Sequence, residues 1–174
     1  MFHPSRFGAT TFARRPPLQL IRSDSPARTR VEPTDEEPLE VDLLADIAAG
    51  LAATISAEVV PSGAERRWTR LLVTRRYEAW LIAWPSGTGL ALHDHGGAAG
   101  VLHVVAGVLE ETFLDGRARR LEPGDVAAFG PAHVHGVRND RREEALSVHV
   151  YSPPLREINS HTAGAVVLPL RAER

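Results

Sequence analysis

Apolar positions follow a helical spacing first and a strand-like spacing afterwards. From Asp35 to Ile55 most apolar residues recur at intervals of three or four. Thr34 and Glu37 have the spacing of a capping box, in which each side chain bonds the other's backbone N–H. The turn-forming residues 61–63 end this segment. The pattern therefore predicts a short N-terminal helical region.

After Arg67 the apolar runs become short and are separated by Gly, Pro, Asn and Asp. The candidate strands lie near residues 69–74, 78–84, 88–94, 101–106, 108–113, 118–121, 125–129, 134–138, 145–151 and 165–168. Asp115-Gly116 is a strong signal for a hairpin turn between two of them. Many short strands at regular spacing predict an all-β fold of the jelly-roll type, either a sandwich or a barrel.

Residues 1–35 differ from the rest in having few periodic apolar positions and several Pro and Ser residues. The stretch is rich in Arg and has no acid before Asp24, so a transit peptide is conceivable. A disordered extension or a mis-assigned start fits better, and the apolar core of a signal peptide is missing. We expect a flexible tail over 1–35 and a single domain over 36–174.

Composition narrows the possible chemistry. The 174 residues carry a net charge of -2, which disfavours a nucleic-acid binder, and no apolar run reaches the ~20 residues of a membrane span. There is no cysteine, so thiolate metal sites and cysteine nucleophiles are excluded. All 20 basic residues are Arg, which excludes Schiff-base and P-loop lysines. A metal here would need His, Asp, Glu or backbone oxygen as ligands.

Histidine is concentrated in the strand-rich region, where six of the eight lie between residues 93 and 149. His93 and His95 are two residues apart, so on a strand both imidazoles point to the same face and Asp94 points away. His135 lies near a later strand and could bring a third nitrogen from across the barrel. Three imidazoles on one side leave coordination positions open, as a catalytic metal requires.

Several alternatives stay open at this point. A lone histidine in a strand, such as His103 or His161, is usually a core or surface residue. The His-x-His pair favours a metal, but imidazole suits Zn, Cu, Fe and Ni alike. His133 and His135 have the same parity, so periodicity cannot choose between them as the third ligand.

These residues resemble the first motif of the cupin superfamily, which reads G-x5-H-x-H-x3,4-E-x6-G. Gly87, His93, His95 and Gly107 stand at its positions, whereas Gly100 stands where most cupins have a glutamate ligand. The loss of that carboxylate is a feature of thiol dioxygenases. The resemblance to this family implies that three histidines are the metal ligands.

The second cupin motif ends in H-x3-N, which His135 and Asn139 match. Its upstream part is one residue short, so His133 is a possible substitute ligand. Two further segments resemble the cysteine dioxygenase (thiol dioxygenase) family in particular. Residues 147–154 read SVHVYSPP, against S-x-H-x-Y-S-P-P, and residues 68–73 read WTRLLV, against Y-x-R-x-L-V. The resemblance covers about residues 65–155 and implies a cupin-type jelly-roll β-barrel.

The resemblance implies Fe(II) as cofactor, held by His93, His95 and His135. Ser147, His149 and Tyr151 alternate along one strand and so face the same way, which permits a hydrogen-bonded relay ending at the tyrosine hydroxyl. We expect these three residues to be catalytic. The competing interpretation is a Tyr–His pair that only satisfies buried polar groups. The Cys–Tyr crosslink of some family members cannot form here, because the chain has no cysteine.

Arg70 and Trp68 are the expected substrate-binding residues. A guanidinium binds a carboxylate through two parallel hydrogen bonds, and the resemblance implies that Arg70 meets the carboxylate of cysteine. Trp68 replaces the family's Tyr and can donate a hydrogen bond but not accept one. Arg70 could instead be one member of a surface cluster, since four other arginines lie nearby: Arg66, Arg67, Arg75 and Arg76.

The expected reaction is oxidation of L-cysteine by O2 to cysteine sulfinic acid, in which both oxygen atoms enter the sulfur. The alternatives are a sibling enzyme acting on 3-mercaptopropionate, cysteamine or another small thiol, or a non-catalytic metal-binding cupin. A Zn or Mn cupin isomerase is disfavoured by Gly100. We expect a cytoplasmic monomer whose partners are the small thiol and O2, with no nucleic acid and no membrane.

Overall fold

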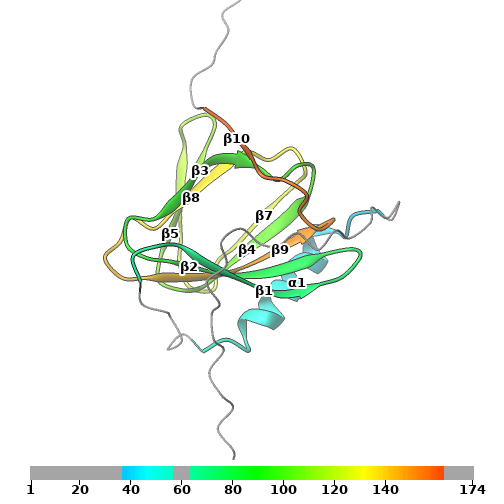
Figure 1. Cartoon of the computed structure of the whole chain (residues 1–174), viewed down its shortest axis with the longest axis horizontal. Helices are drawn as coiled ribbons and strands as arrows, with labels where there is room; N and C mark the ends of the chain where they lie inside the picture. Colours follow the sequence, from blue (N-terminus) through cyan, green and yellow to red (C-terminus); the bar gives the residue numbers. More distant parts are fainter. Residues whose placement is uncertain (1–36, 57–62, 163–174) are drawn as a thin grey trace, which may run out of the picture.

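The computed structural model describes residues 37–56 and 63–162 (Figure 1). One helix is followed by ten short strands. Their bounds are α1 Val41–Ala52, β1 Arg67–Val73, β2 Glu78–Trp84, β3 Gly89–Asp94, β4 Ala99–Ala106, β5 Leu109–Phe113, β6 Ala118–Leu121, β7 Val126–Phe129, β8 His135–Arg138, β9 Ala145–Ser152 and β10 Asn159–Ser160.

The strands form two five-stranded sheets that pack face to face as a jelly-roll. One sheet has the order β1-β2-β9-β4-β7, and the other has the order β10-β3-β8-β5-β6. The predicted all-β fold with a short helical region is confirmed, and nine of the ten expected strands are present. The Asp115-Gly116 turn joins β5 to β6, with Gly116 at a φ of 81°. The expected strand near 165–168 and the expected tail over 1–35 lie outside the described residues.

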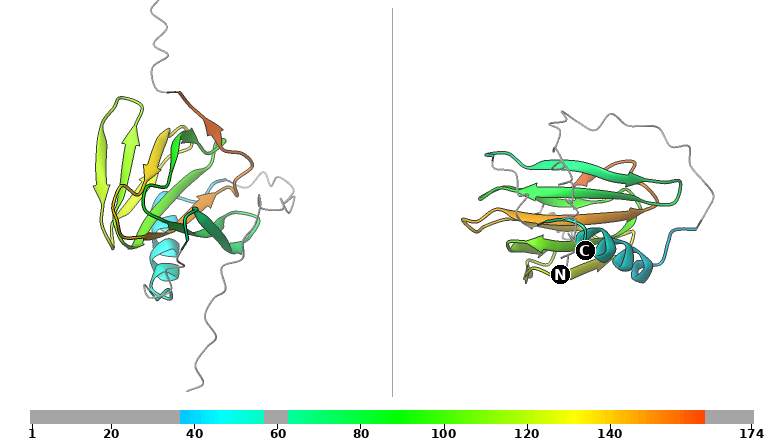
Figure 2. Two further views of the ribbon diagram at one scale, coloured as in Figure 1. Left: turned by 60° about the vertical axis from the view of Figure 1, so that its left-hand side comes forward. Right: turned by 90° about the horizontal axis from the view of Figure 1, so that it is seen from below.

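β9 lies at the centre of its sheet and is buried along its whole length. Its sequence therefore has to satisfy two different environments. Leu146, Val148 and Val150 face outward and pack against α1, which lies across this face of the sheet (Figure 2). The residues between them, including Ser147 and His149, face the interior of the barrel. An alternating strand thus carries apolar packing on one side and polar chemistry on the other.

The barrel interior is divided into an apolar end and a polar end. The apolar end is filled by side chains from both sheets, namely Trp84, Leu102, Val104, Leu109, Leu121, Ala127, Val137 and Ala145. At the other end the buried side chains include four histidines: His93, His95, His135 and His149. The apolar packing fixes the distance between the sheets and so determines which polar side chains meet across the interior.

The helix begins later than its apolar pattern predicts. α1 starts at Val41 after Glu40, which makes no side-chain capping bond, so Glu37 precedes the helix. Thr34, the other member of the expected capping box, lies outside the described residues. Pro38 disfavours helical backbone at the residue before it, and the Leu39 N–H donates to Ser152 Oγ instead of entering a helix. Within the described ranges, no helix combines the length and the apolar character that crossing a membrane requires.

β10 has no counterpart among the predicted strands, because its two residues show no apolar alternation. Side-chain bonds hold this strand against β3. Asp94 accepts from Asn159 Nδ2 at 3.0 Å and bonds His161 Nε2 at 2.6 Å. Asp94 thus points away from its two histidine neighbours, as the strand parity predicts, and fastens the segment after β9 beside them.

Asn139, which ends the second cupin motif, connects three parts of the chain. It is fully buried, and its Nδ2 donates to the Trp84 and Glu143 carbonyls at 2.8 Å each. We expect Asn139→Ala to lower the free energy of unfolding by about 2–3 kcal/mol, since a buried acceptor left unpaired costs about 1–3 kcal/mol. Urea unfolding followed by circular dichroism measures this. Asp140→Ala at the exposed neighbour is the control, and equal midpoints for the two variants would contradict the prediction.

Candidate metal centre

Three histidines from one sheet meet at the polar end of the barrel. His93 near the end of β3 lies opposite His135 at the start of β8 in the strand register, and His95 follows β3 directly. The ring centroids of His93 and His135 are 4.9 Å apart, and those of His95 and His135 are 5.1 Å apart. One ring nitrogen from each lies within 4.8 Å of the other two. The structure therefore brings together the three residues that the sequence nominates as ligands.

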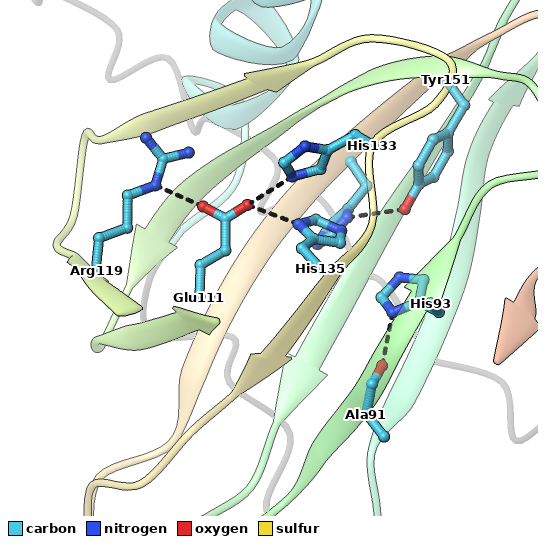
Figure 3. A network of polar contacts seen from close by, with 8 residues as sticks. Ala91, His93, Glu111, Arg119, His133, His135 and Tyr151 are labelled. Atoms are coloured by element: carbon cyan, nitrogen blue, oxygen red, sulfur yellow. Dashed lines mark hydrogen bonds and ion pairs between the residues drawn. The ribbon is translucent and has the colours of Figure 1, made fainter. Parts of the chain in front are cut away.

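Two of the rings are oriented by hydrogen bonds on their outer side (Figure 3). His93 Nδ1 lies 2.8 Å from the Ala91 carbonyl, and His135 Nδ1 lies 2.6 Å from Glu111 Oε1. A carbonyl or carboxylate oxygen can only accept, so each Nδ1 carries the hydrogen. The Nε2 lone pairs of both rings are left for the centre, as is usual for metal-binding histidines.

His95 gives the clearest test of whether these residues fit a metal. It is 1% exposed, and neither of its ring nitrogens has a hydrogen-bond partner among the described residues. Its ring stacks on Phe129 with centroids 4.6 Å apart. Buried polar atoms are nearly always paired, so an imidazole held in this way requires an explanation. A cation bound by His93, His95 and His135 provides it.

Burial also keeps two of these rings in the form that binds metals. Desolvation lowers the pKa of His93 to about 4 and the pKa of His95 to about 3. The neighbouring imidazoles act in the same direction, because a proton on one ring disfavours a proton on the next. Both rings are therefore neutral near pH 7, with lone pairs available to a cation.

Glu111 is a buried carboxylate behind the centre that the sequence reasoning missed. It lies on β5, is 0% exposed, and contacts both His135 Nδ1 and Arg119 Nε. Burial alone would raise its pKa, but hydrogen bonds and charge from His135 and Arg119 lower it to about 2. The sequence could have predicted this position. Glu111 and Leu109 are two residues apart on β5, so both side chains face the interior of the barrel.

His133 lies beside His135, with the two ring centroids 4.8 Å apart. Its Nε2 is 3.5 Å from Glu111 Oε1, and its ring stacks on Phe129 at 5.4 Å. His133 forms a potential ligand group with Glu111 and His135, but not with His93 and His95. The geometry thus groups His135, and not His133, with His93 and His95, and these three residues are called the histidine cluster.

Gly100 faces the centre from the opposite sheet, on β4. A Cβ at this position would lie 2.7 Å from the Phe129 ring and 2.8 Å from Tyr151 Cδ1. Real Cβ atoms do not approach other atoms so closely, so any side chain here would displace one of the two rings. The two rings occupy the space that a glutamate ligand needs, which explains why this cupin motif carries glycine.

The three alternating residues of β9 form the expected hydrogen-bonded chain. Ser147 Oγ lies 2.9 Å from His149 Nε2, and His149 Nδ1 lies 3.0 Å from the Tyr151 hydroxyl. The indole of Trp84, which the sequence reasoning did not include, donates to Ser147 Oγ at 2.8 Å. Because an indole N–H can only donate, it gives the chain a direction.

The direction follows from the available hydrogens. Burial lowers the pKa of His149 well below its usual value, so the ring is neutral and carries one hydrogen. If Ser147 donates to Nε2, then Nδ1–H donates to Tyr151, and the tyrosine hydrogen is free to point into the interior. In the reverse order the Ser147 hydrogen has no acceptor among the described residues. Burial also raises the pKa of Tyr151, so its hydroxyl keeps its proton.

A cavity of about 70 Å³ separates the histidine cluster from this chain. His93 and His135 line it from one sheet, and His149 and Tyr151 line it from the other. Its remaining lining residues are Arg66, Trp68, Ile82, Trp84, Leu90, Val137 and Ile158. The volume admits only a small ligand, held between the candidate metal ligands and the Tyr151 hydroxyl.

The two expected substrate-binding residues differ in position. Trp68 lines the cavity, whereas Arg70 does not. Arg70 pairs with Trp80 in the strand register, and its guanidinium lies 5.4 Å from the Trp80 ring and 3.9 Å from Glu78. The arginine that lines the cavity is Arg66, just before β1.

Comparison with known proteins agrees with this geometry. The sequence model of the family "Cysteine dioxygenase type I" matches residues 58–163, more than half of the chain. Cysteine dioxygenase type 1 of Danio rerio is 30% identical over 107 residues, which are 52% of this chain and 53% of the relative. The protein of the same name from Rattus norvegicus is 30% identical over 104 residues, 51% and 52% of the two chains. The chain thus spans about half the length of these relatives.

Solved structures support the fold. A conserved Klebsiella pneumoniae protein with a double-stranded β-helix domain superposes with a TM-score of 0.54 at 24% identity, covering 62% of this chain and 96% of that one. The polyketide cyclase RemF of Streptomyces resistomycificus gives a TM-score of 0.52 at 14% identity, covering 60% and 77%. Identities this low establish the double-stranded β-helix alone. The match of the family model over more than half of the chain shows that the chain belongs to the cysteine dioxygenase type I family of the cupin superfamily.

Proposed function

We propose that the protein is a mononuclear Fe(II) thiol dioxygenase that converts L-cysteine and O2 to cysteine sulfinic acid. One observation carries the proposal, namely that the histidine cluster and the Tyr151 hydroxyl face each other across a cavity of about 70 Å³. The absence of a carboxylate at Gly100 supports three neutral ligands, and the family match supports the reaction class.

His93, His95 and His135 would hold the iron through ring nitrogens. The chemistry supplied by Fe(II) at such a site is activation of O2 next to a thiolate sulfur. The overall reaction is balanced without another reductant, since R–SH and O2 give R–SO2H. Sulfur is oxidised, O2 is reduced, and both oxygen atoms end on the sulfur.

The protein's own contribution on the opposite side is a fixed hydrogen-bond donor. The chain from Trp84 through Ser147 and His149 holds the Tyr151 hydroxyl oxygen, while the raised pKa keeps its hydrogen in place. The hydroxyl can then donate to an oxygen or a polar atom of the substrate in the cavity. A donor that is already oriented needs no reorganisation when charge develops during the reaction.

The rest of the lining is largely apolar, and the cavity is small. Ile82, Leu90 and Val137 form an apolar wall beside the candidate ligands, and a cavity of about 70 Å³ favours a small substrate. Apolar surroundings strengthen the electrostatic interactions inside such a site. These features support a small thiol as the substrate, with 3-mercaptopropionate and cysteamine as the alternatives to L-cysteine.

The proposal is tested by anaerobic loading with Fe(II), followed by O2 uptake with L-cysteine, 3-mercaptopropionate and cysteamine as separate substrates. We expect one sulfinate formed for each O2 consumed, and L-cysteine as the substrate with the highest kcat/KM. Zn(II)-loaded protein is the control for iron-dependent turnover. Bound Fe(II) with no sulfinate from any of the thiols would support a non-catalytic metal-binding cupin instead.

Glu111 allows a test of the metal centre that does not depend on activity. We expect Glu111→Gln to weaken Fe(II) binding by about 10–100-fold, because loss of a carboxylate behind a metal-binding histidine typically has this effect. The glutamine removes the charge that holds the His135 ring at 2.6 Å. Competition with a chelator under anaerobic conditions measures the affinity.

Glu110→Gln is the matched control, because this neighbour faces the other side of β5 and its carboxylate is 3.8 Å from Arg138. Circular dichroism establishes that both variants are folded. Equal affinities for Fe(II) in the Glu110→Gln and Glu111→Gln proteins would contradict the role given to Glu111.

A further inference from the structure

A second group of potential metal ligands adjoins the histidine cluster and shares one residue with it. Glu111, His133 and His135 each offer one ligand atom, and these atoms all lie within 4.8 Å of one another. We call these three residues the outer triad. The cavity beside the histidine cluster is lined by His135, but not by Glu111 or His133. The outer triad is therefore a separate place for a ligand.

Both imidazoles of the outer triad converge on one carboxylate oxygen (Figure 3). Glu111 Oε1 lies 2.6 Å from His135 Nδ1 and 3.5 Å from His133 Nε2. The other oxygen, Oε2, accepts a hydrogen bond from Arg119 Nε, which holds the carboxylate in place. Carboxylates that bind metals are usually held by outer hydrogen bonds of this kind. The geometry thus leaves Oε1 facing two ring nitrogens that can share a cation with it.

His133 is the member of the outer triad whose position requires an explanation. Its Nε2 is buried and makes no hydrogen bond within residues 37–56 and 63–162, although Glu111 Oε1 lies 3.5 Å away. Its ring packs against Phe129 and Phe113, with centroid distances of 5.4 Å and 5.8 Å. Buried polar atoms are nearly always paired. A cation between Nε2 and Oε1 would pair both atoms.

The ligand types and their spacing fit zinc. Atoms that bind a tetrahedral Zn(II) lie roughly 3.3 Å apart, given bonds of about 2.0–2.1 Å. The 3.5 Å between His133 and Glu111 is close to this value, and His135 would need to move by less than about 1 Å. Two histidines and a glutamate form an established set of zinc ligands, to which Fe(II) binds more weakly. The His133 side chain is 25% exposed, so water can supply the fourth ligand.

We propose that the outer triad is a Zn(II) site that can be occupied only while the histidine cluster is empty. A neutral imidazole has one lone pair, so His135 can serve one centre at a time. Binding at the histidine cluster uses Nε2, with the hydrogen on Nδ1. Binding at the outer triad uses Nδ1 and moves the hydrogen to Nε2. An ion at either centre therefore weakens binding at the other by the same factor.

The site is tested by titrating Zn(II) into metal-free His95→Leu, which lacks one ligand of the histidine cluster and keeps the outer triad. We expect one Zn(II) per chain by isothermal titration calorimetry. Adding His133→Leu should weaken binding by about 100-fold or more, because even a residue behind a ligand contributes about 10–100-fold. Adding His103→Leu instead is the control and should leave the affinity unchanged.

Circular dichroism establishes that the variants are folded, and the same series on His93→Leu repeats the test in a second background. Equal Zn(II) affinities with and without His133→Leu overturn the proposal. A folded His95→Leu protein that binds no Zn(II) overturns it as well.

Two measurements test the exclusion between the centres. Long-range proton–nitrogen NMR reports which ring nitrogen of His135 carries the hydrogen, and Zn(II) bound to His95→Leu should move it from Nδ1 to Nε2. Metal analysis of Fe(II)-loaded wild type, after addition of Zn(II) and removal of unbound metal, should give one ion per chain in total. Two ions per chain, or a hydrogen that stays on Nδ1, overturns the shared use of His135.

The proposal concerns metal binding alone and goes beyond the proposed function. If the iron-loaded wild type oxidises no thiol, the proposed function fails, while the Zn(II) titrations still decide whether the outer triad is a metal site.

Discussion

Replacing His95 with leucine is expected to weaken Fe(II) binding by more than about 100-fold, because even an outer carboxylate contributes about 10–100-fold to metal affinity. In the wild type, Fe(II) at 100 times its Kd should add about 2.7 kcal/mol to the free energy of unfolding. His95→Leu should lose this stabilisation at the same Fe(II) concentration. Thermal unfolding with and without Fe(II) under anaerobic conditions measures both effects.

The stability of the metal-free His95→Leu variant tests the same site without Fe(II). His95 is 1% exposed, and both of its ring nitrogens are unpaired among residues 37–56 and 63–162. Each unpaired buried group costs about 1–3 kcal/mol. Leucine removes this penalty and loses the ring stacking on Phe129, which contributes only about 0.5–1.5 kcal/mol. Metal-free His95→Leu is therefore expected to be at least as stable as metal-free wild type.

His103→Leu is the matched control for this prediction. His103 also has a buried nitrogen, Nδ1, with no partner in the described part of the chain. It lies on β4 on the α1 side of the sheet, opposite Val148 in the register. Its replacement should leave the Fe(II)-dependent stabilisation intact. If His95→Leu kept that stabilisation, or if His103→Leu lost it, the histidine cluster would not be the metal site.

Tyr151→Phe is expected to lower kcat for L-cysteine oxidation by about 100-fold or more, because removal of one pre-oriented hydrogen-bond donor usually costs about 10²–10³ in kcat. The change removes the hydroxyl that His149 holds at 3.0 Å and leaves the ring in place beside Gly100. Fe(II) affinity should stay unchanged, because Tyr151 contributes no ligand to the histidine cluster. Steady-state O2 uptake and chelator competition measure the two quantities.

The chain provides a matched control in its other tyrosine. Tyr77 lies in the turn between β1 and β2, where its backbone carbonyl accepts from Thr74, and it does not line the cavity. Tyr77→Phe should leave kcat within about 3-fold of wild type, because Tyr77 is partly buried on the α1 side of the sheet and away from the cavity. If Tyr151→Phe lowered only the stability, by about 1 kcal/mol for one lost hydrogen bond, the chain on β9 would merely satisfy buried polar groups.

Most of the fold could be predicted from apolar spacing and turn residues. β2 and β6 have the expected bounds, and the other strands near 69–151 differ from expectation by at most two residues at an end. The start of α1 and the strand β10 were not predicted correctly, because contacts between residues far apart in the chain determine both. The Leu39 N–H bonds Ser152 from 113 residues away, and β10 is held by Asp94 rather than by apolar alternation.

Much of the candidate site could also be inferred from spacing. Alternation on β9 places Ser147, His149 and Tyr151 on one face, and the three residues are hydrogen-bonded in that order. Gly100 stands where most cupins have a glutamate ligand. The structure gives a reason for the glycine, because a Cβ at this position would lie 2.7 Å from the Phe129 ring. Parity could not separate His133 from His135, because both have the same orientation along the chain.

The sequence alone determined which residues share a face of a strand, since side-chain direction alternates with a fixed period of two. On that basis Arg66, Trp68 and Arg70 are equivalent. Only the tertiary structure decided that Arg66 reaches the cavity while Arg70 reaches Glu78, and that Glu111 supports His135. These choices depend on strand register, on the bulge after Arg70 and on the spacing between two sheets, all of which are set by packing between segments far apart in the chain.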